Sequence, residues 1–290
     1  MLSALLLATT PAMPQDFTLA DFVSPDAKVA QVATGFRFTE GPVWTPKGLI
    51  FSDIPASKLY LINAEGVVST YRDPSHEANG NVLDAQGRLL TCEHATHRVV
   101  REEEGGKITV IAETYEGKRL CAPNDLAVHR DGAVYFTDPF FGRNPESLPL
   151  DFRGVYRVVP GGSPVLLTKE IELPNGIAFS PDSKTLYVSD SRTAGLFAFP
   201  VLDNGLIGPQ KWRVNFERDK PGAADGMAVH PTGVIFCTGP GGVILVSPDG
   251  KIIGRIDTPE TSTNCCFGGA DGKTLYITAN TSVYSIRVNR

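Results

Sequence analysis

The sequence contains few cysteines, and they are not spaced as a metal or disulfide framework would require. There are five, an odd number, with no CxxC pair and no histidine spacing typical of a zinc site. Cys265 and Cys266 are adjacent in a strand-like run, so their side chains should point to opposite faces. We expect the thiols to be buried, because free cysteine packs as a small hydrophobic residue.

The chain also lacks a basic cluster, an interdomain linker and a hydrophobic run long enough to cross a membrane. The net charge is −5 without a concentration of Lys or Arg, which argues against a nucleic-acid surface. Residues 1–15 contain a short apolar run that ends in small residues, but no Lys or Arg precedes it. We interpret residues 1–15 as a signal-like or disordered segment, which leaves both an exported and a cytoplasmic protein open. Residues 16–290 are expected to form one domain.

Six related stretches recur along the chain. Each has an apolar run, a turn containing Pro, Asp or Gly, and a second run of alternating β-branched and aromatic residues, which is the pattern of a β-hairpin. They occupy residues 40–53, 79–93, 124–138, 175–190, 225–239 and 264–279, and their starts are 39 to 51 residues apart. Further strand-like runs, such as residues 58–71 and 108–115, lie between them. Four strands per unit, repeated six times, predict an all-β, six-bladed β-propeller.

The end of the chain predicts how the ring closes. After residue 264 about three strands remain, so the last blade lacks one. Residues 28–38 precede the first hairpin and can supply the missing outer strand. Pairing the two ends of the chain in one blade would remove an exposed sheet edge.

One position of the repeat carries an oxygen acceptor in every unit. The six residues are Glu40, Asn79, Asn124, Asn175, Asp225 and Asn264. Because the innermost strands surround the channel, these side chains should meet at one end of it, where such a set suits Ca²⁺. The alternative is turn chemistry, since Asn and Asp are common before strands. Glu40 is a poor turn residue, and six of six positions favour a site.

At these residues the sequence resembles the SMP-30/gluconolactonase/luciferin-regenerating family, with bacterial gluconolactonase-like proteins as the nearest branch. The matching phrases are FTEGPVW (38–44), GRLLTCEH (87–94), APNDLAVHRDGAVYFTDPFFG (122–142), LPNGIAFSPD (173–182) and ADGMAVHPTG (224–233). The resemblance runs from about residue 30 to the C terminus. It implies a calcium propeller whose metal ligands are Glu40, Asn124, Asn175 and Asp225; Zn²⁺ or Mn²⁺ are possible replacements.

The resemblance implies hydrolysis of a small sugar lactone such as gluconolactone. A bound cation would polarise the lactone carbonyl, and Asp225 is the candidate general base, with one oxygen on the metal and the other free to take a proton from water. A purely ligating Asp225 is the alternative. No GxSxG motif is present to support a serine triad.

Substrate contacts are assigned at the same end of the channel. The candidates are Asn79, His94, Cys121, Phe140, Arg143 and Asn264. Cys121 departs from the Ser or Asn that related gluconolactonases often carry, and it would alter substrate contacts if it faced the pocket. Phe140 and Arg143 lie in the long loop 139–154, which either covers the lactone or only packs over a neighbouring blade. His129 and His230 fall in turns at the far end, where we expect solvated side chains.

Two other functions stay open. A phosphotriesterase of the diisopropylfluorophosphatase type shares the fold and a similar calcium site. The second is a non-catalytic propeller that binds a ligand or protein. The ring of oxygen acceptors argues against it, because such a protein needs no metal at its centre. The expected partner is a small lactone, with no nucleic acid and no membrane span.

Overall fold

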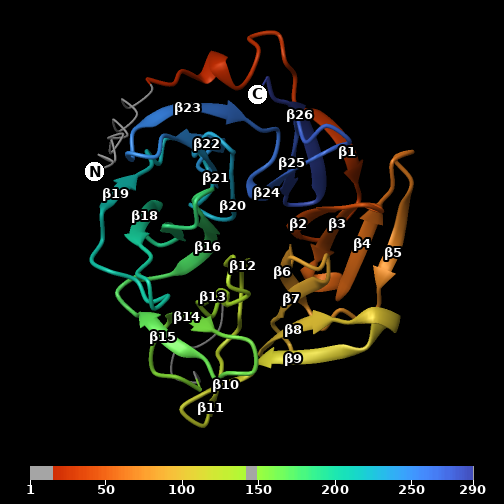
Figure 1. Cartoon of the computed structure of the whole chain (residues 1–290). Coiled ribbons are helices and arrows are strands. Elements are labelled where there is room, and N and C mark those ends of the chain that lie inside the picture. The colour runs from red at the N-terminus through yellow and green to blue at the C-terminus, as the bar shows by residue number, and fades with distance from the viewer. Residues whose placement is uncertain (1–15, 142–148, 290) are drawn as a thin grey trace, which may run out of the picture.

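The computed structural model describes residues 16–141 and 149–289. Six four-stranded antiparallel sheets are arranged around a central channel, with β2, β6, β12, β16, β20 and β24 innermost (Figure 1). The predicted all-β, six-bladed propeller is therefore confirmed. Residues 1–15 and Arg143 lie outside the described residues. None of the helices in the described ranges has the length and hydrophobicity that a membrane span requires.

The blades follow one another along the chain. Blade 1 consists of β2 (Thr39–Thr45), β3 (Gly48–Asp53), β4 (Lys58–Ile62) and β5 (Val68–Arg72), and blade 2 of β6 (Ala78–Leu83), β7 (Leu89–Glu93), β8 (Arg98–Glu102) and β9 (Ile108–Ala112). Blade 3 consists of β12 (Leu126–Val128), β13 (Val134–Asp138), β14 (Gly154–Val158) and β15 (Val165–Thr168), and blade 4 of β16 (Pro174–Phe179), β17 (Thr185–Asp190), β18 (Gly195–Pro200) and β19 (Trp212–Asn215).

The last two blades contain the remaining long strands. Blade 5 consists of β20 (Met227–Val229), β21 (Ile235–Gly239), β22 (Gly242–Val246) and β23 (Ile252–Asp257), and blade 6 of β24 (Ser262–Gly268), β25 (Thr274–Ala279), β26 (Ser282–Arg287) and β1 (Ala30–Thr34). A short hairpin, β10 (Thr114–Tyr115) and β11 (Lys118–Arg119), joins blades 2 and 3. The short 3₁₀ turns are η1 (Leu19–Asp21), η2 (Ile54–Ala56) and η3 (Glu104–Gly106).

The N-terminal strand closes the ring as predicted. β1 pairs antiparallel with β26, from Ala30 opposite Ser285 to Thr34 opposite Ser282. In Figure 1 the red β1 lies beside the blue β26, although the two are the most distant strands in the sequence. The edge that β26 would otherwise expose is therefore paired, and β1 takes over as the outer strand.

The segment before β1 adds a second contact that the sequence did not suggest. Phe22 is fully buried, with its ring centroid 5.7 Å from that of Phe236 and 5.4 Å from that of His230. The prediction of a solvated His230 is wrong for this reason, because the imidazole is only 5% exposed within this aromatic group. His230 does occupy a hairpin turn, but the N-terminal segment covers that turn.

Hydrophobic clusters fill the spaces between neighbouring blades. The cluster between blades 2 and 3 includes Cys92, Cys121, Phe136 and Tyr156. Four of the five cysteines are buried and Cys266 is half-buried, which agrees with their prediction as packed thiols. Burial raises the pKa of the Cys121 thiol to about 12, so it remains protonated near neutral pH.

Candidate active site

The six repeated acceptor residues lie at the starts of the innermost strands, and a break in strand pairing accompanies most of them. The pairing of β2 with β3 shifts register between Glu40 and Val43, and that of β16 with β17 shifts between Pro174 and Ile177. Similar shifts occur in blades 2 and 6. In these four blades the acceptor lies inside the strand, not before it as expected. A bulge redirects the side chain at such a point.

Close packing of the inner strands explains the glycine that follows several of these residues. A Cβ on Gly41 would lie 2.1 Å from the carbonyl oxygen of Asn79, and Gly41 also has a φ of +47°. A Cβ on Gly176 would lie 2.3 Å from the carbonyl oxygen of Asp225. Only glycine allows the backbone of the next blade to come this near.

Hydroxyl groups on the second strands hold the same backbone from the neighbouring blade. The bonds to carbonyl oxygens run from Ser52 to Asn79 (2.6 Å), from Thr137 to Asn175 (2.6 Å) and from Ser189 to Asp225 (2.8 Å). These acceptors belong to residues of the candidate site. The site is therefore held by bonds between blades as well as by the strand that carries each residue.

Three amides form a directed chain of hydrogen bonds. Asn79 donates from Nδ2 to Asn124 Oδ1 at 2.6 Å, and Asn124 Nδ2 donates to Asn175 Oδ1 at 2.6 Å. Asn175 Nδ2 then donates to Ser191 Oγ at 2.9 Å, and that hydroxyl donates to the carbonyl of Ala224 at 2.7 Å. Each accepting amide oxygen keeps a second lone pair. The chain thus orients Asn124 and Asn175 with acceptor capacity left for a ligand.

Three carboxyl groups are neighbours at this end of the channel: those of Glu40 and Asp125, which are buried, and that of Asp225, which is half-buried. Burial, followed by the Asp125 carboxyl, raises the pKa of Glu40 to about 8, and burial raises the pKa of Asp125 to about 7. The pKa of Asp225 is raised well above its ordinary value by burial and then by Glu40 and Asp125. Buried like charges oppose one another's ionisation, so a positive charge among them would favour all three carboxylates.

Asp125 was missed by sequence reasoning. Its Oδ2 lies 3.4 Å from Asn264 Nδ2 and its Oδ1 accepts the N–H of Leu126 at 2.9 Å. The signal was present in the Asn124–Asp125 pair, but Asp125 lies one residue after the repeated acceptor position, where the other units carry no shared acceptor. Ser191, which extends the amide chain, was missed as well.

Two oxygens among these residues are placed as a divalent cation would require. Asp225 Oδ1 and Asn79 Oδ1 are buried and have no hydrogen-bond partner among the described residues. An unpartnered buried acceptor costs free energy, and a hard cation would satisfy such oxygens. In the same ranges, no group of three or more His, Cys, Asp or Glu has the arrangement of a metal site. The candidate site differs because amides supply half of its four predicted ligands.

His94 and Asn264 lie beside the repeated residues. His94 Nε2 is 3.3 Å from Asn79 Nδ2, and the His94 backbone N–H donates to the carbonyl of Glu77. Asn264 Oδ1 accepts the N–H of Cys265 at 2.8 Å, so this amide also stabilises its own strand. Both side chains are therefore in contact with the group, and their roles toward a substrate stay predictions.

The structure does not bring Cys121 and Phe140 into this group. Cys121 is fully buried, its thiol 3.9 Å from the carbonyls of Leu150 and Phe152. Phe140 is 8% exposed and packs in the same cluster between blades 2 and 3. Neither side chain offers a surface to a substrate in this arrangement, because both are buried in this cluster.

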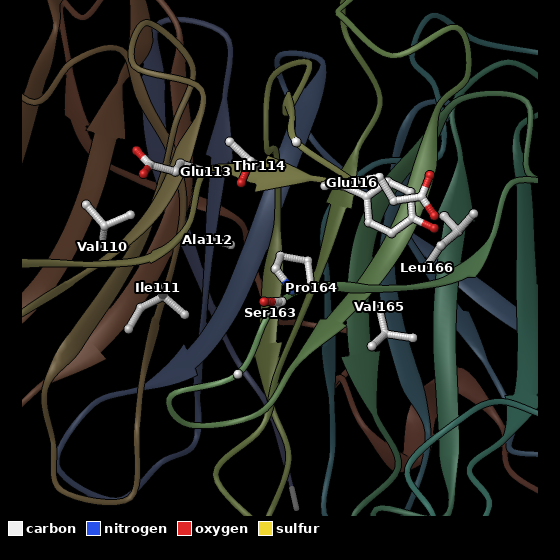
Figure 2. Close-up of a pocket in the computed structure, with 13 residues that line it drawn as sticks. Val110, Ile111, Ala112, Glu113, Thr114, Glu116, Ser163, Pro164, Val165 and Leu166 are labelled. Atoms are coloured by element: carbon white, nitrogen blue, oxygen red, sulfur yellow. The ribbon is translucent and has the colours of Figure 1, made fainter.

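One cavity adjoins the site, and a larger groove lies away from it. The cavity of about 300 Å³ lies in the channel, is lined by Asp125 and Asn264, and touches the inner strands of all six blades. A larger groove of about 740 Å³ lies on the outside, where Figure 2 shows Val110 and Ile111 facing Val165 and Leu166. The residues lining this groove include two carboxylates and no cationic side chain.

The fold and the ring of oxygen donors define a six-bladed propeller with a polar site at one end of its channel. The model of the SMP-30/Gluconolactonase/LRE-like region matches residues 38–281. The gluconolactonase of Zymomonas mobilis subsp. mobilis is 32% identical over 285 residues, covering 88% of this chain and 80% of that protein. The chain therefore belongs to the SMP-30/gluconolactonase/LRE-like family, as its sequence motifs indicated.

Solved structures agree with this membership. The gluconolactonase of Xanthomonas campestris has a TM-score of 0.85 and 32% identity, covering 98% of this chain and 99% of that one. The calcium-binding regucalcin of Agrobacterium tumefaciens has a TM-score of 0.74 and 23% identity, covering 90% of this chain and 95% of that one. At that identity regucalcin supports the fold alone.

Proposed function

We propose that this protein is a lactonase that hydrolyses a small sugar lactone, such as gluconolactone, at a divalent-cation site formed by Glu40, Asn124, Asn175 and Asp225. The observation that carries the proposal is the meeting of buried carboxyls and oriented amides at one end of the channel. The similarity to gluconolactonases supports the reaction class. Asp125, Asn79 and Asn264 lie around the four ligands.

Ca²⁺ is the cation that this donor set favours. All of the proposed donors are oxygens, and Ca²⁺ takes carboxylate and amide oxygens in flexible geometry. Sulfur is not among them, and burial raises the pKa of the Cys237 thiol, which lies 3.8 Å from the carbonyl oxygen of Asp225. When bound, such a cation supplies Lewis-acid polarisation of a lactone carbonyl.

Asp225 is proposed to move the proton in this reaction. Its Oδ1 is buried and has no hydrogen-bond partner among the described residues, so this oxygen is free to face the cation, and the other carboxylate oxygen would accept the proton from water. Hydrolysis adds that water to the lactone carbonyl carbon, the ring ester bond breaks, and an open hydroxy acid is released. Burial, and then Glu40 and Asp125, raise the pKa of Asp225 in the cation-free protein, and a bound cation would favour the carboxylate, which is the form that can act as a base.

A panel of substrates tests this proposal against its rivals. We expect purified protein to hydrolyse aldonolactones in the presence of calcium and to lose that activity in chelator. A phosphotriester included in the panel tests the phosphotriesterase alternative. A protein that binds calcium but hydrolyses neither class would support a binding propeller instead, and turnover unaffected by chelator would contradict cation dependence.

The pH dependence of calcium stabilisation tests the site independently of any substrate. In the cation-free protein, burial favours the neutral form of Glu40. The stability that this form contributes is fully present below the ordinary pKa of 4.5 and is lost as pH rises through the folded-state pKa of about 8. Cation binding needs the carboxylate and therefore releases protons at lower pH. We expect calcium to raise Tm more at about pH 9 than at about pH 6. Calorimetry with calcium and with chelator measures both values; an equal or larger shift at the lower pH would contradict the site.

A further inference from the structure

Buried aspartates at the ends of second strands hold the backbone that precedes candidate ligands. In blade 1, Asp53 ends β3, and its Oδ2 and Oδ1 accept the N–H groups of Arg37 and Phe38 at 3.0 and 3.1 Å. Glu40 follows Phe38 by two residues. The Asp53 side chain is only 2% exposed, so these bonds are shielded from water.

The same arrangement recurs in blades 3 and 4. Asp138 ends β13, and its two oxygens accept the N–H groups of Cys121 and Ala122 at 2.8 and 2.5 Å, directly before Pro123 and Asn124. In blade 4, Asp190 ends β17, and its Oδ1 accepts the N–H of Leu173 at 3.1 Å, two residues before Asn175. Leu173 is followed by Pro174, which has no N–H to donate.

The other blades differ at the equivalent position. Glu93 ends β7 and is just as buried, but it accepts from Thr96 Oγ1 at 2.5 Å and from Arg98 Nε at 2.7 Å. Gly239 ends β21 and Ala279 ends β25, so neither strand ends in a carboxylate. The aspartate is therefore found in the three blades that carry Glu40, Asn124 and Asn175, and it is missing from the two blades that carry no proposed ligand and from blade 5, which carries Asp225.

We propose that Asp53, Asp138 and Asp190 are positioning residues for the cation site, each fixing the peptide groups that lead into one ligand. The assignment rests on the proposed cation site. A buried carboxylate that accepts N–H groups of the preceding backbone, two in blades 1 and 3 and one in blade 4, restricts the chain two residues before the ligand, so the ligand oxygen reaches the channel in one place. Loss of such outer partners typically weakens metal affinity by about 10–100-fold.

Asp→Asn substitutions at two of the three positions separate geometry from charge. In Asp53→Asn, an amide NH₂ replaces one of two oxygens that each accept a backbone N–H, so one bond is lost in either orientation of the amide. In Asp190→Asn, Oδ1 keeps its bonds to Leu173 and Arg192, while the new NH₂ can donate to Thr193 Oγ1, which lies 2.8 Å from Oδ2. Both variants remove one buried negative charge.

We expect the two variants to differ in calcium affinity. Isothermal titration with calcium chloride should show a Kd about 10-fold higher or more for Asp53→Asn, and a Kd within about threefold of the original protein for Asp190→Asn. Asp190→Ala, which removes all three bonds, should weaken affinity about as much as Asp53→Asn. Thermal unfolding in chelator shows whether each variant folds. Glu93→Gln is the matched control, because it removes a buried carboxylate at the end of a second strand that accepts from the side chains of Thr96 and Arg98.

Each outcome decides the assignment. Equal weakening in Asp53→Asn and Asp190→Asn would overturn it, because charge and not bonding would then be the cause. Affinities within twofold of the original for both Asp53→Asn and Asp190→Ala, or an equal loss in Glu93→Gln, would also overturn it. If the unchanged protein binds no calcium, the cation site itself fails and the positioning role falls with it, which is distinguishable from failure in the variants alone.

Discussion

The Asp225→Asn variant is expected to lower lactonase kcat by about 10²–10⁴-fold even at saturating calcium, the usual range for loss of a general base. The substitution keeps the size of the side chain and one coordinating oxygen, but removes a charge and the proton acceptor. Because Asp225 lies beside two buried carboxyls, its charge also contributes to attraction of a cation. We therefore expect weaker calcium binding together with a loss of turnover that calcium does not restore.

Asn175→Ala provides the matched comparison for Asp225→Asn. Asn175 belongs to the amide chain: it accepts a hydrogen bond from Asn124 and donates one to Ser191. Its neutral amide cannot act as a general base. Its truncation should raise the calcium Kd, and excess calcium should restore much of the activity. The measurement is kcat for both variants across a calcium titration. Full recovery of Asp225→Asn at high calcium would make Asp225 a ligand only, and Glu40 and His94 would be the next candidates for the base.

A chain that begins at residue 39 is expected to lose its cooperative thermal unfolding transition. It lacks β1, so β26 exposes its whole edge, and it also lacks Phe22 from the aromatic group around His230. Unpaired edges destabilise a sheet and promote association between chains. Circular dichroism during heating and size-exclusion chromatography would detect both effects.

Two further truncations separate the strand from the aromatic contact. A chain beginning at residue 16 keeps both and should unfold as the full chain does. A chain beginning at residue 28 keeps β1 but loses Phe22 together with Phe17 and Val23 of the same cluster, so we expect a loss of at least about 3 kcal/mol, the lower end of the usual cost of removing a buried Phe side chain. If the chain beginning at residue 39 were as stable as the one beginning at residue 28, closure by β1 would not matter and our interpretation would be wrong.

The repeat and its closure could be predicted because they depend on local patterns. A turn such as His129–Gly132 closes within four residues, with Gly132 N–H donating to the carbonyl of His129 at 2.8 Å, and it needs no distant contact. The alternation of apolar residues then sets which face of each strand is buried. Because only about three strands follow residue 264, the number of strands alone predicts that residues 28–38 complete the last blade.

The sequence by itself therefore determined the propeller, its closure and the identity of the repeated acceptors, because each follows from spacing along one stretch of chain. Tertiary structure alone decided which side chains join them. Asp125 turns toward Asn264, 139 residues away, while the packing of blade 3 hides Cys121 from the channel. The contacts of the strand-end carboxylates likewise could not be inferred from the sequence. Asp53 and Glu93 look alike in sequence, but only the folded chain brings Asp53 to the backbone before Glu40 and Glu93 to Arg98.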